Sequence, residues 1–351
     1  MKKVLAPYMK VGFKDNKLYL GFGSIKKIIH DKFEQKLILE ILACLKKPTD
    51  KSGILKSLMR KYENSEVLSK FVDEIFESPY VIDIGIYKRE DRYSRNLLYY
   101  NLNKIDPLKV QHALESKHIV ILGCGGIGNI ASLLLSSLGV RHLTLIDDDK
   151  IELSNLNRQF AFCEKDVGFF KTDILKQAIL DRNSSIQVDI LKMKITTENV
   201  NTLPIADLVI LSADSNGIVR LINEFSLKNN VPYLNIGYIQ DIACWGPFVI
   251  PYKTCCFLCQ NNLANQESDF ELMNLVNLIN QKNQVPSNGF VNTLAASFGV
   301  LDVVRYLGKF GQVMSYNKRI GLHTDSLKWE EQSWSKNPEC VYCKQILEPI
   351  S

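Results

Sequence analysis

The sequence predicts an α/β protein in which a doubly wound, mostly parallel sheet follows a small N-terminal α+β lobe. From about residue 117 onward, short apolar strands alternate with helical stretches, which is the pattern of a parallel sheet covered by helices. The first of these strands runs into a glycine-rich turn that is typical of nucleotide-binding βαβ units. Residues 1–85 lack this alternation, so we expect them to form a unit separate from residues 86–351.

The N-terminal lobe is expected to contain one hairpin and several helices. The hairpin is predicted at "KVGFKDNKLYLGFG", and helical stretches follow at "KFEQKLILEILACLK", "SGILKSLMRKY" and "EVLSKFVDEIF". The lobe has more Lys and Arg than Asp and Glu, but it carries no nucleic-acid-binding signature. We therefore expect no nucleic-acid partner.

The remaining elements follow a charged linker. The linker, "YKREDRYSRNLLYY", is rich in tyrosine and is expected to run over the surface. Beyond it, strands are predicted at "HLTLIDDD", "QVDILKMKI" and "ADLVILSAD", a helix at "KTDILKQAILDRN", and a helix followed by a strand in "EFSLKNNVPYLNIGYI". Residues 261–290 are polar and rich in asparagine, so we expect a crossover loop or insertion there.

Composition places the chain among ordinary globular proteins. Its 351 residues are 46% hydrophobic and 23% charged, with a net charge of +5. No apolar run reaches the roughly 18–20 residues that span a bilayer, and the N-terminal apolar run is too short for a signal peptide. Nine cysteines without a secretion signal indicate free thiols or metal ligation. We expect a cytoplasmic protein that does not contact a membrane.

The glycine turn lies in "IVILGCGGIGNIAS", residues 119–132. Gly123, Gly125 and Gly128 have G-x-G-x-x-G spacing, and residues 129–137 continue with helical periodicity. Such a turn permits a tight bend, a close approach of phosphate and close packing of the helix on the strand. NAD, FAD and ATP all suit it, so the turn alone does not select the ligand.

Residues after the second strand favour a triphosphate. Asp147 ends that strand about twenty residues after the turn, where a carboxylate can bind ribose hydroxyls or can cap a loop. Beyond it lie Asn155, Arg158 and Gln159, and Lys171 begins a helix. Arg158 and Lys171 offer two cations to a polyphosphate, whereas a nicotinamide dinucleotide needs neither.

A carboxylate at the end of another strand adds a metal ligand. Asp214, in "LSADSNG", can hold Mg²⁺ in a site completed by phosphates and waters. A glycine turn, two cations and this carboxylate at one sheet edge indicate attack on a nucleoside triphosphate.

Two C-x-x-C pairs predict a zinc site. Each pair can supply two thiolates to one tetrahedral metal, and the long interval between the pairs would join distant parts of one domain. A redox-active pair and ordinary buried thiols remain alternatives. The four cysteines are Cys256, Cys259, Cys340 and Cys343. Cys44, Cys124, Cys163 and Cys244 are expected to be core or packing residues.

The ordered set "RYSR", "GCGGIG", "LIDDDKIELSNLNRQ", "DVGFFK", "SAD" and the cysteine pairs resembles the E1-like ThiF/MoeB adenylating enzymes over residues 91–345. The resemblance implies a Rossmann-like E1/ThiF adenylation domain, activation of a C-terminal carboxylate by ATP, a homodimer and a structural Zn²⁺. It assigns nucleotide binding to Gly123, Gly125, Gly126, Gly128, Asp147, Asp149, Asn155, Arg158, Gln159 and Lys171. It also assigns Mg²⁺ to Asp214, and it matches Arg95 to an arginine that reaches the phosphates of the neighbouring subunit.

Two features narrow the resemblance. Residues 260–339 contain no cysteine, so the thioester step of ubiquitin activators is not expected. The additional N-terminal lobe and the segments "RYSRNLLYY", "VILGCGGIGN" and "NKRIGLHTD" resemble the MccB branch, which acts in microcin C biosynthesis. That branch implies a short ribosomally made peptide whose C-terminal asparagine is activated, closed to a succinimide and joined to a nucleotide through an N–P (phosphoramidate) bond.

Several alternatives remain open at this point. The chain could adenylate a ubiquitin-like sulfur-carrier protein, as MoeB and ThiF do, or could be a non-catalytic scaffold. CTP could replace ATP, because the sequence does not identify the base. The lobe could clamp the peptide or serve dimerisation. His323, in "GLHTD", could act as a base but also suits a structural role at a strand end.

Overall fold

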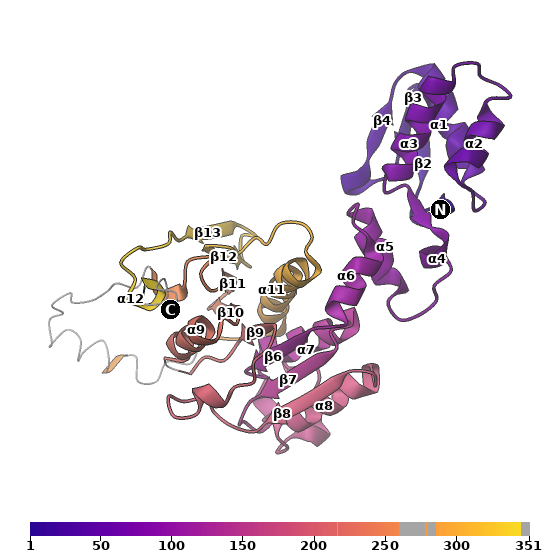
Figure 1. The fold of residues 1–351 in the computed structure, drawn as a ribbon. Coiled ribbons are helices and arrows are strands. Elements are labelled where there is room, and N and C mark those ends of the chain that lie inside the picture. Colours follow the sequence, from indigo (N-terminus) through magenta and orange to yellow (C-terminus); the bar gives the residue numbers. More distant parts are fainter. Residues whose placement is uncertain (216, 260–277, 280–285, 345–351) are drawn as a thin grey trace, which may run out of the picture. The chain divides into compact units, whose positions relative to one another are not determined.

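The computed structural model describes residues 1–215, 217–259, 278–279 and 286–344. It divides into two compact units, Met1–Gln111 and His112–Ser351 (Figure 1). The division lies later than the boundary expected at residue 85, because the linker folds in part. Its second half forms helix α5, Ser94–Leu102, which buries Leu97 and Tyr100. The prediction of a surface linker was wrong for this half, since two apolar residues three apart share one helix face.

The first unit contains two small antiparallel sheets. Strand β1 (Lys3–Leu5) pairs with β5 (Val81–Asp83). Strands β2 (Val11–Lys14), β3 (Lys17–Leu20) and β4 (Lys27–Ile29) form the second sheet. The predicted hairpin is confirmed by β2 and β3, and its two turn residues, Asp15 and Asn16, have φ of 50° and 57°. Positive φ at both positions is the geometry of tight hairpin turns.

Helices supply most of the core of this unit. The three predicted helices are confirmed as α1 (Lys32–Cys44), α2 (Lys51–Leu58) and α3 (Ser65–Glu77). Each begins where a side-chain oxygen accepts a hydrogen bond from the first turn, and these N-caps are Asp31, Asp50 and Asn64. The remaining helices are η1 (Gly23–Ile25), α4 (Ile84–Tyr87) and α6 (Pro107–Leu114), which crosses the division between the units.

The second unit is built on one eight-stranded sheet with the order β13-β12-β11-β10-β9-β6-β7-β8. Strands β6 to β10 are parallel, and β11 to β13 continue the sheet antiparallel. This confirms the predicted mostly parallel sheet. The strands are β6 (His118–Leu122), β7 (His142–Ile146), β8 (Gln187–Leu191), β9 (Leu208–Leu211), β10 (Tyr233–Ile239), β11 (Ile242–Val249), β12 (Lys318–His323) and β13 (Trp329–Ser333).

Helices cover both faces of this sheet. Helices α7 (Gly126–Leu138), α8 (Lys171–Arg182) and α11 (Gly289–Gly308) pack together along one face. Figure 1 shows α9 (Ile218–Asn229) and α12 (Val341–Lys344) on the other side. Short helices η2 (Leu153–Asn155), η3 (Glu164–Asp166), η4 (Val200–Thr202) and η5 (Phe257–Cys259) complete the described elements. Loops at the carboxyl ends of β6, β7 and β9 therefore meet at one edge.

Helix α11 is long and apolar enough by composition to cross a bilayer, although the sequence analysis expected no such run. It packs against α7, β10 and β11, and 56% of its apolar window is buried inside the protein. We therefore describe it as a core helix. The insertion expected at residues 261–290 lies largely outside the described residues.

Candidate functional site

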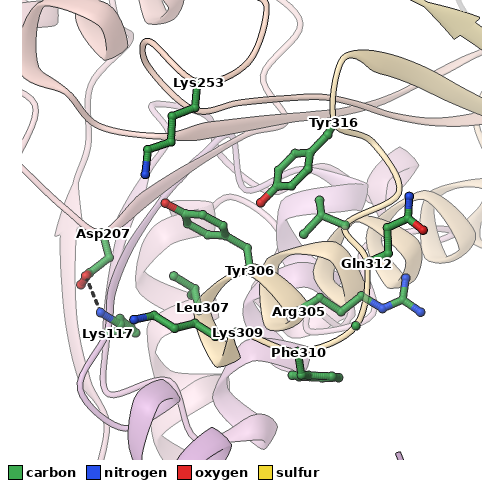
Figure 2. A pocket seen from close by; sticks show the side chains of 12 residues that line it. Lys117, Asp207, Lys253, Arg305, Tyr306, Leu307, Lys309, Phe310, Gln312 and Tyr316 are labelled. Carbon is green, nitrogen blue, oxygen red and sulfur yellow. Dashed lines mark hydrogen bonds and ion pairs between the residues drawn. The ribbon is translucent and has the colours of Figure 1, made fainter.

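Two cavities of similar size lie in the second unit. One, of about 610 Å³, surrounds the end of α11 (Figure 2). The other, of about 600 Å³, lies where β6, β7 and β9 end and is lined by the glycine turn. Because phosphate ligands bind at the carboxyl edge of doubly wound sheets, the second cavity is the candidate active site.

The glycine turn is close-packed against its surroundings. Gly123 has a φ of 92°, and a Cβ there would lie 2.7 Å from the Ala213 backbone nitrogen. A Cβ on Gly128 would lie 1.8 Å from the Gly123 carbonyl oxygen. Gly125 precedes α7 without any side-chain cap, so the first N–H groups of that helix are open to a ligand. These contacts account for the glycine spacing and leave an anion-binding helix end at the cavity.

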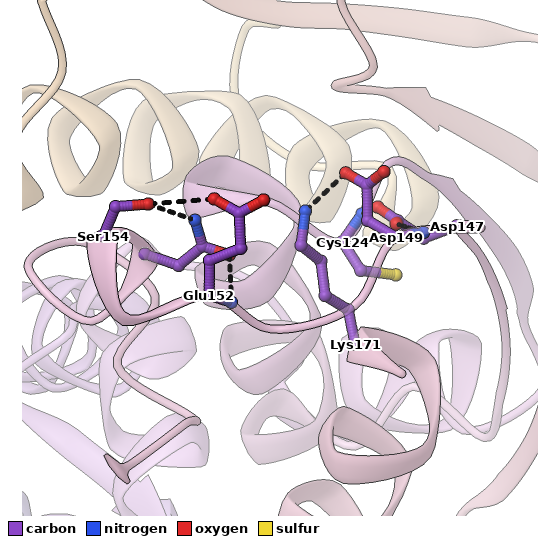
Figure 3. Close-up of polar contacts among 7 residues, drawn as sticks. Cys124, Asp147, Asp149, Glu152, Ser154 and Lys171 are labelled. Atoms are coloured by element: carbon purple, nitrogen blue, oxygen red, sulfur yellow. Dashed lines mark hydrogen bonds and ion pairs between the residues drawn. The ribbon is translucent and has the colours of Figure 1, made fainter. Parts of the chain in front are cut away.

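Asp147 is fixed at the end of β7 by the backbone. Its carboxylate accepts hydrogen bonds from the Cys124 nitrogen at 2.6 Å and from the Asp149 nitrogen at 2.9 Å (Figure 3). Burial raises the pKa of Asp147 above its ordinary value, and the nearby Lys171 ammonium opposes that rise. The side chain lines the cavity and can accept hydrogen bonds from ribose hydroxyls.

Lys171 is the least expected charge in the cavity. The residue is only 7% exposed, and it is the first residue of α8, where the helix dipole disfavours a cation. Its ammonium lies 2.6 Å from an Asp149 carboxylate oxygen (Figure 3). Buried lysines are rare unless they are paired, so this ion pair holds the ammonium at the cavity wall. A phosphate entering the cavity would compete with Asp149 for it.

The segment after β7 contributes three further side chains. Asn155 is buried and its Oδ1 accepts a hydrogen bond from the Glu152 nitrogen at 3.2 Å, which shapes η2. Arg158 donates through Nη1 to the Ser154 carbonyl at 2.8 Å and to the Asn157 side chain at 2.9 Å. Gln159 is buried beside Gly125, and its Oε1 has no hydrogen-bond partner among the described residues. An unpaired buried amide oxygen beside a phosphate turn is an acceptor left for a ligand.

Carboxylates from two strand ends face the same cavity. Asp214 follows β9, is exposed and lines the cavity. Carboxylate oxygens of Asp147, Asp148 and Asp149 lie within 4.8 Å of one another. Oxygen ligands of this kind suit Mg²⁺ together with nucleotide phosphates. All predicted nucleotide residues of the second unit except Gly128 line this one cavity, and Gly128 packs against the Gly123 carbonyl within the turn.

Arg95 lies in the first unit, on α5, and is exposed. It is not among the residues that line the cavity within the same chain. The role that the sequence resemblance implies for Arg95 stays a prediction.

Asn292 on α11 is a site residue that was not predicted from the sequence. Its side chain is 1% exposed and donates to the Ser287 hydroxyl at 2.9 Å and to the Asn288 carbonyl at 2.6 Å. A Cβ on Gly126 would lie 2.8 Å from it, so α11 contacts the glycine turn through this amide. A polar residue within the apolar stretch "GFVNTLAASFGV" was the available signal. Other lining residues that were not predicted include Ser212, Gly237 and Tyr238.

The four predicted zinc ligands form one buried cluster. The Sγ atoms of Cys256 and Cys340 lie 3.7 Å apart, those of Cys256 and Cys259 3.8 Å, and those of Cys259 and Cys343 3.7 Å. Thiolates at about 2.3 Å from a tetrahedral Zn²⁺ would be about 3.8 Å apart. None of the four is in a disulfide. The cluster therefore fits the size of a Zn²⁺ ion.

The other cysteines and His323 have different surroundings. Cys124 and Cys244 are buried and Cys44 is half-buried, as expected for packing residues. The expectation was wrong for Cys163, which is exposed and precedes η3, where its Sγ lies 3.0 Å from an Asp166 carboxylate oxygen. The His323 Nε2 lies 2.9 Å from a Glu330 carboxylate oxygen across β12 and β13, which is a structural contact.

Comparison with solved structures gives a match over almost the whole chain. The structure of E. coli MccB with MccA-N7isoASN superposes with a TM-score of 0.89 and 32% sequence identity, covering 98% of this chain and 100% of that chain. E. coli MccB with ATP gives a TM-score of 0.88 over 98% of this chain and 100% of that chain, also at 32% identity. MccB has further been solved with succinimide, with 31% identity.

Sequence comparison matches adenylyltransferases over a shorter part of the chain. A model described as the ThiF family matches residues 93–342. The ThiS sulfur-carrier adenylyltransferase of Escherichia coli strain K12 is 30% identical over 172 residues, and the alignment covers 48% of this chain and 66% of that protein. The SAMP-activating enzyme E1 of Haloferax volcanii is 30% identical over 47% of this chain and 60% of its own length. The match thus spans less than two thirds of these two curated relatives.

Proposed function

The chain belongs to the ThiF family, and we propose that it is an ATP-dependent peptide nucleotidyltransferase. In this proposal it adenylates the C-terminal asparagine of a short ribosomal peptide and then forms a peptidyl-nucleotide N–P bond, as part of microcin C-like antibiotic biosynthesis. The observation that carries the proposal is the match to E. coli MccB over 98% of this chain and 100% of that chain, which includes the N-terminal unit. MccB has been solved with MccA, with a succinimide and with ATP.

The cavity suits the first chemical step. An oxygen of the peptide carboxylate attacks the α-phosphorus, the bond to the β-phosphate oxygen breaks, and pyrophosphate leaves with the electron pair. Lys171 and Arg158 would neutralise the leaving charge, and Asp214 would hold a Mg²⁺ ion that supplies further positive charge. A carboxylate is already ionised at neutral pH, so this step needs no general base.

The second step follows from the asparagine side chain. Its amide nitrogen would displace AMP from the activated carboxylate to close a succinimide. The imide nitrogen would then lose its proton to solvent and attack the α-phosphorus of a second nucleotide, which releases pyrophosphate and forms the N–P bond. Water would finally open the imide ring, so the peptide gains one nucleoside monophosphate in total. The amide nitrogen attacks the acyl group bound to the α-phosphate, and the imide nitrogen attacks an α-phosphorus. Both reacting centres therefore lie next to an α-phosphate, and one phosphate-binding cavity can serve both reactions.

Other parts of the chain have supporting roles in this proposal. The four-cysteine cluster would hold a structural Zn²⁺, the first unit would clamp the peptide, and Arg95 would act on the cavity of the partner in a homodimer. The enzyme would work in the cytoplasm on a soluble peptide. The absence of cysteine from residues 260–339 argues against a thioester intermediate.

A second candidate is adenylation of a ubiquitin-like sulfur carrier. It is favoured by the 30% identity to the ThiS adenylyltransferase. That alignment covers 48% of this chain, whereas the MccB match includes the N-terminal unit as well.

The test is mass spectrometry of Asn-ended peptides after incubation with the full-length protein, Mg²⁺ and ATP, CTP or GTP in separate reactions. The expected product gains one nucleoside monophosphate and survives hydroxylamine, which cleaves an acyl-adenylate. The same peptides ending in Asp are the matched control, because they cannot close a nitrogen-containing ring.

The contrary outcome is equally specific. In that outcome no Asn-ended peptide gains the mass of a nucleoside monophosphate, and a carrier protein ending in Gly-Gly stimulates pyrophosphate exchange. The chain would then be an adenylyltransferase of a sulfur-carrier protein.

A further inference from the structure

The cavity of about 610 Å³ around the end of α11 belongs to the opposite edge of the sheet from the glycine turn (Figure 2). Lys117 directly precedes β6 and Asp207 directly precedes β9, whereas the glycine turn follows β6. The five residues of β6 separate the two edges by about 16 Å, at about 3.3 Å per residue. A small ligand in one cavity therefore does not reach the other.

Four cations line this cavity, and they are Lys117, Lys253, Arg305 and Lys309. Among the described residues that line it, Asp207 is the only carboxylate, and it binds Lys117 at 2.9 Å. Arg305 lies 3.6 Å from Asp302.

Lys253 and Lys309 have no acidic partner in the part of the chain that the structure describes. Figure 2 shows their ammonium groups on the same side of the hollow as Lys117. Like charges that converge in a partly enclosed space repel one another and attract an anion.

Two tyrosine rings form another wall of the cavity. Tyr306 and Tyr316 both pack on the fully buried Phe248, with ring centroids 4.9 Å and 5.6 Å from it. This packing holds both rings in place beside the cations. A fixed aromatic wall is a surface on which a nucleobase can stack.

Lys309 reaches the cavity through an unusual backbone conformation. It caps α11 with a φ of 53°, in the left-handed region that glycine usually occupies at this position. This conformation directs the Lys309 side chain toward Lys117 (Figure 2).

We propose that this cavity is a second nucleotide-binding site, with the base against Tyr306 and Tyr316 and the phosphates on Lys253, Lys309 and Lys117. The convergent unpaired ammonium groups beside a fixed aromatic wall carry the assignment. The cavity has no glycine turn and does not share residues with the candidate active site. The second nucleotide is therefore bound rather than consumed.

The test is isothermal titration calorimetry of the full-length protein with a non-hydrolysable ATP analogue and Mg²⁺. The wild-type protein should bind two analogue molecules per chain. The double variant Lys253→Ala, Lys309→Ala should weaken binding at the second site at least tenfold and leave binding at the active-site cavity unchanged. Lys171→Ala should weaken binding at the active-site cavity and leave the second site unchanged. Lys228→Ala with Lys328→Ala removes two exposed charges elsewhere and should leave both events intact.

A single binding event per chain in the wild-type protein, lost in Lys171→Ala, would overturn the proposal. This outcome does not depend on whether any cavity variant folds. Inorganic pyrophosphate that fills the second site as tightly as the analogue would also overturn it, because the tyrosine wall would then contribute nothing.

Discussion

At the scale of single residues, the ion pair of Lys171 with Asp149 is the clearest functional feature of the active-site cavity. Burial and the helix dipole both disfavour a cation that is 7% exposed at a helix N-terminus, and the ion pair with Asp149 offsets them. We expect Lys171→Ala to lower the rate of nucleotidyl transfer about 10²- to 10³-fold, because one charge contact to the leaving phosphates is lost. Steady-state pyrophosphate release measures this.

Lys165→Ala is the matched control for that substitution. Lys165 is an exposed lysine on η3 in the same unit and does not line the cavity. Equal rates for the two variants would remove Lys171 from the chemistry.

The close approach at Gly128 gives a second prediction at this scale. A methyl group there would overlap the Gly123 carbonyl oxygen at 1.8 Å, and neither backbone can move without opening the turn. Gly128→Ala should lower the free energy of unfolding by about 1–3 kcal/mol and should abolish nucleotide binding. Thermal melting with and without an ATP analogue measures both effects.

Gly12 offers the comparison for this prediction. A Cβ on Gly12 would meet only Tyr19, at 3.9 Å, so Gly12→Ala should change stability by less than about 0.5 kcal/mol. If Gly128→Ala melts and binds as the wild-type protein does, the close packing of the turn is not required.

At the scale of elements, the cysteine cluster joins η5 to α12, which are 84 residues apart in the chain. Phe257 and Trp334 pack edge to face beside it, with ring centroids 5.3 Å apart. We expect purified protein to contain one zinc per chain and Cys256→Ser to lose it, because three thiolates hold the ion less tightly. Elemental analysis by mass spectrometry checks this.

Cys163→Ser is the appropriate control for zinc content, since Cys163 is exposed and lies outside the cluster. A wild-type protein without zinc, or a Cys256→Ser protein that keeps it, would contradict the assignment.

Sequence patterns best predicted those features whose residues lie at fixed spacings within one short stretch of the chain. The glycine turn, Asp147 and Lys171 lie at fixed distances along one βαβ unit, so their meeting at one edge follows from the fold class. Asn292 was missed because its place beside Gly126 depends on α11 packing across the sheet. Helix α5 was missed because charged and tyrosine residues mask the apolar pair Leu97 and Tyr100.

At the scale of the whole molecule, Arg95 belongs to the first unit and the nucleotide cavity to the second. If Arg95 acts across a homodimer, then mixing two inactive variants, Arg95→Ala and Lys171→Ala, should restore about a quarter of the wild-type activity. Half of the randomly mixed dimers contain one copy of each variant, and each of these dimers has one complete site and one site that lacks both residues. Activity after co-refolding or co-expression measures this.

The same mixture distinguishes the alternative. If Arg95 serves the cavity of its own chain, every site in the mixed dimer lacks one of the two residues, and no activity should return.

The last strand of the large sheet bears on how the protein associates with other copies at high concentration. Strand β13 is the terminal strand of this sheet among the described residues, and all five of its residues, Trp329 to Ser333, are exposed. Unprotected edges recruit strands from other chains, and charged side chains are a common defence. Glu330 and Glu331 are the charged residues of this strand, and their carboxylates contact His323 and Lys318 of β12. We expect these charged side chains to disfavour the pairing of this edge with strands from other protein molecules at high concentration.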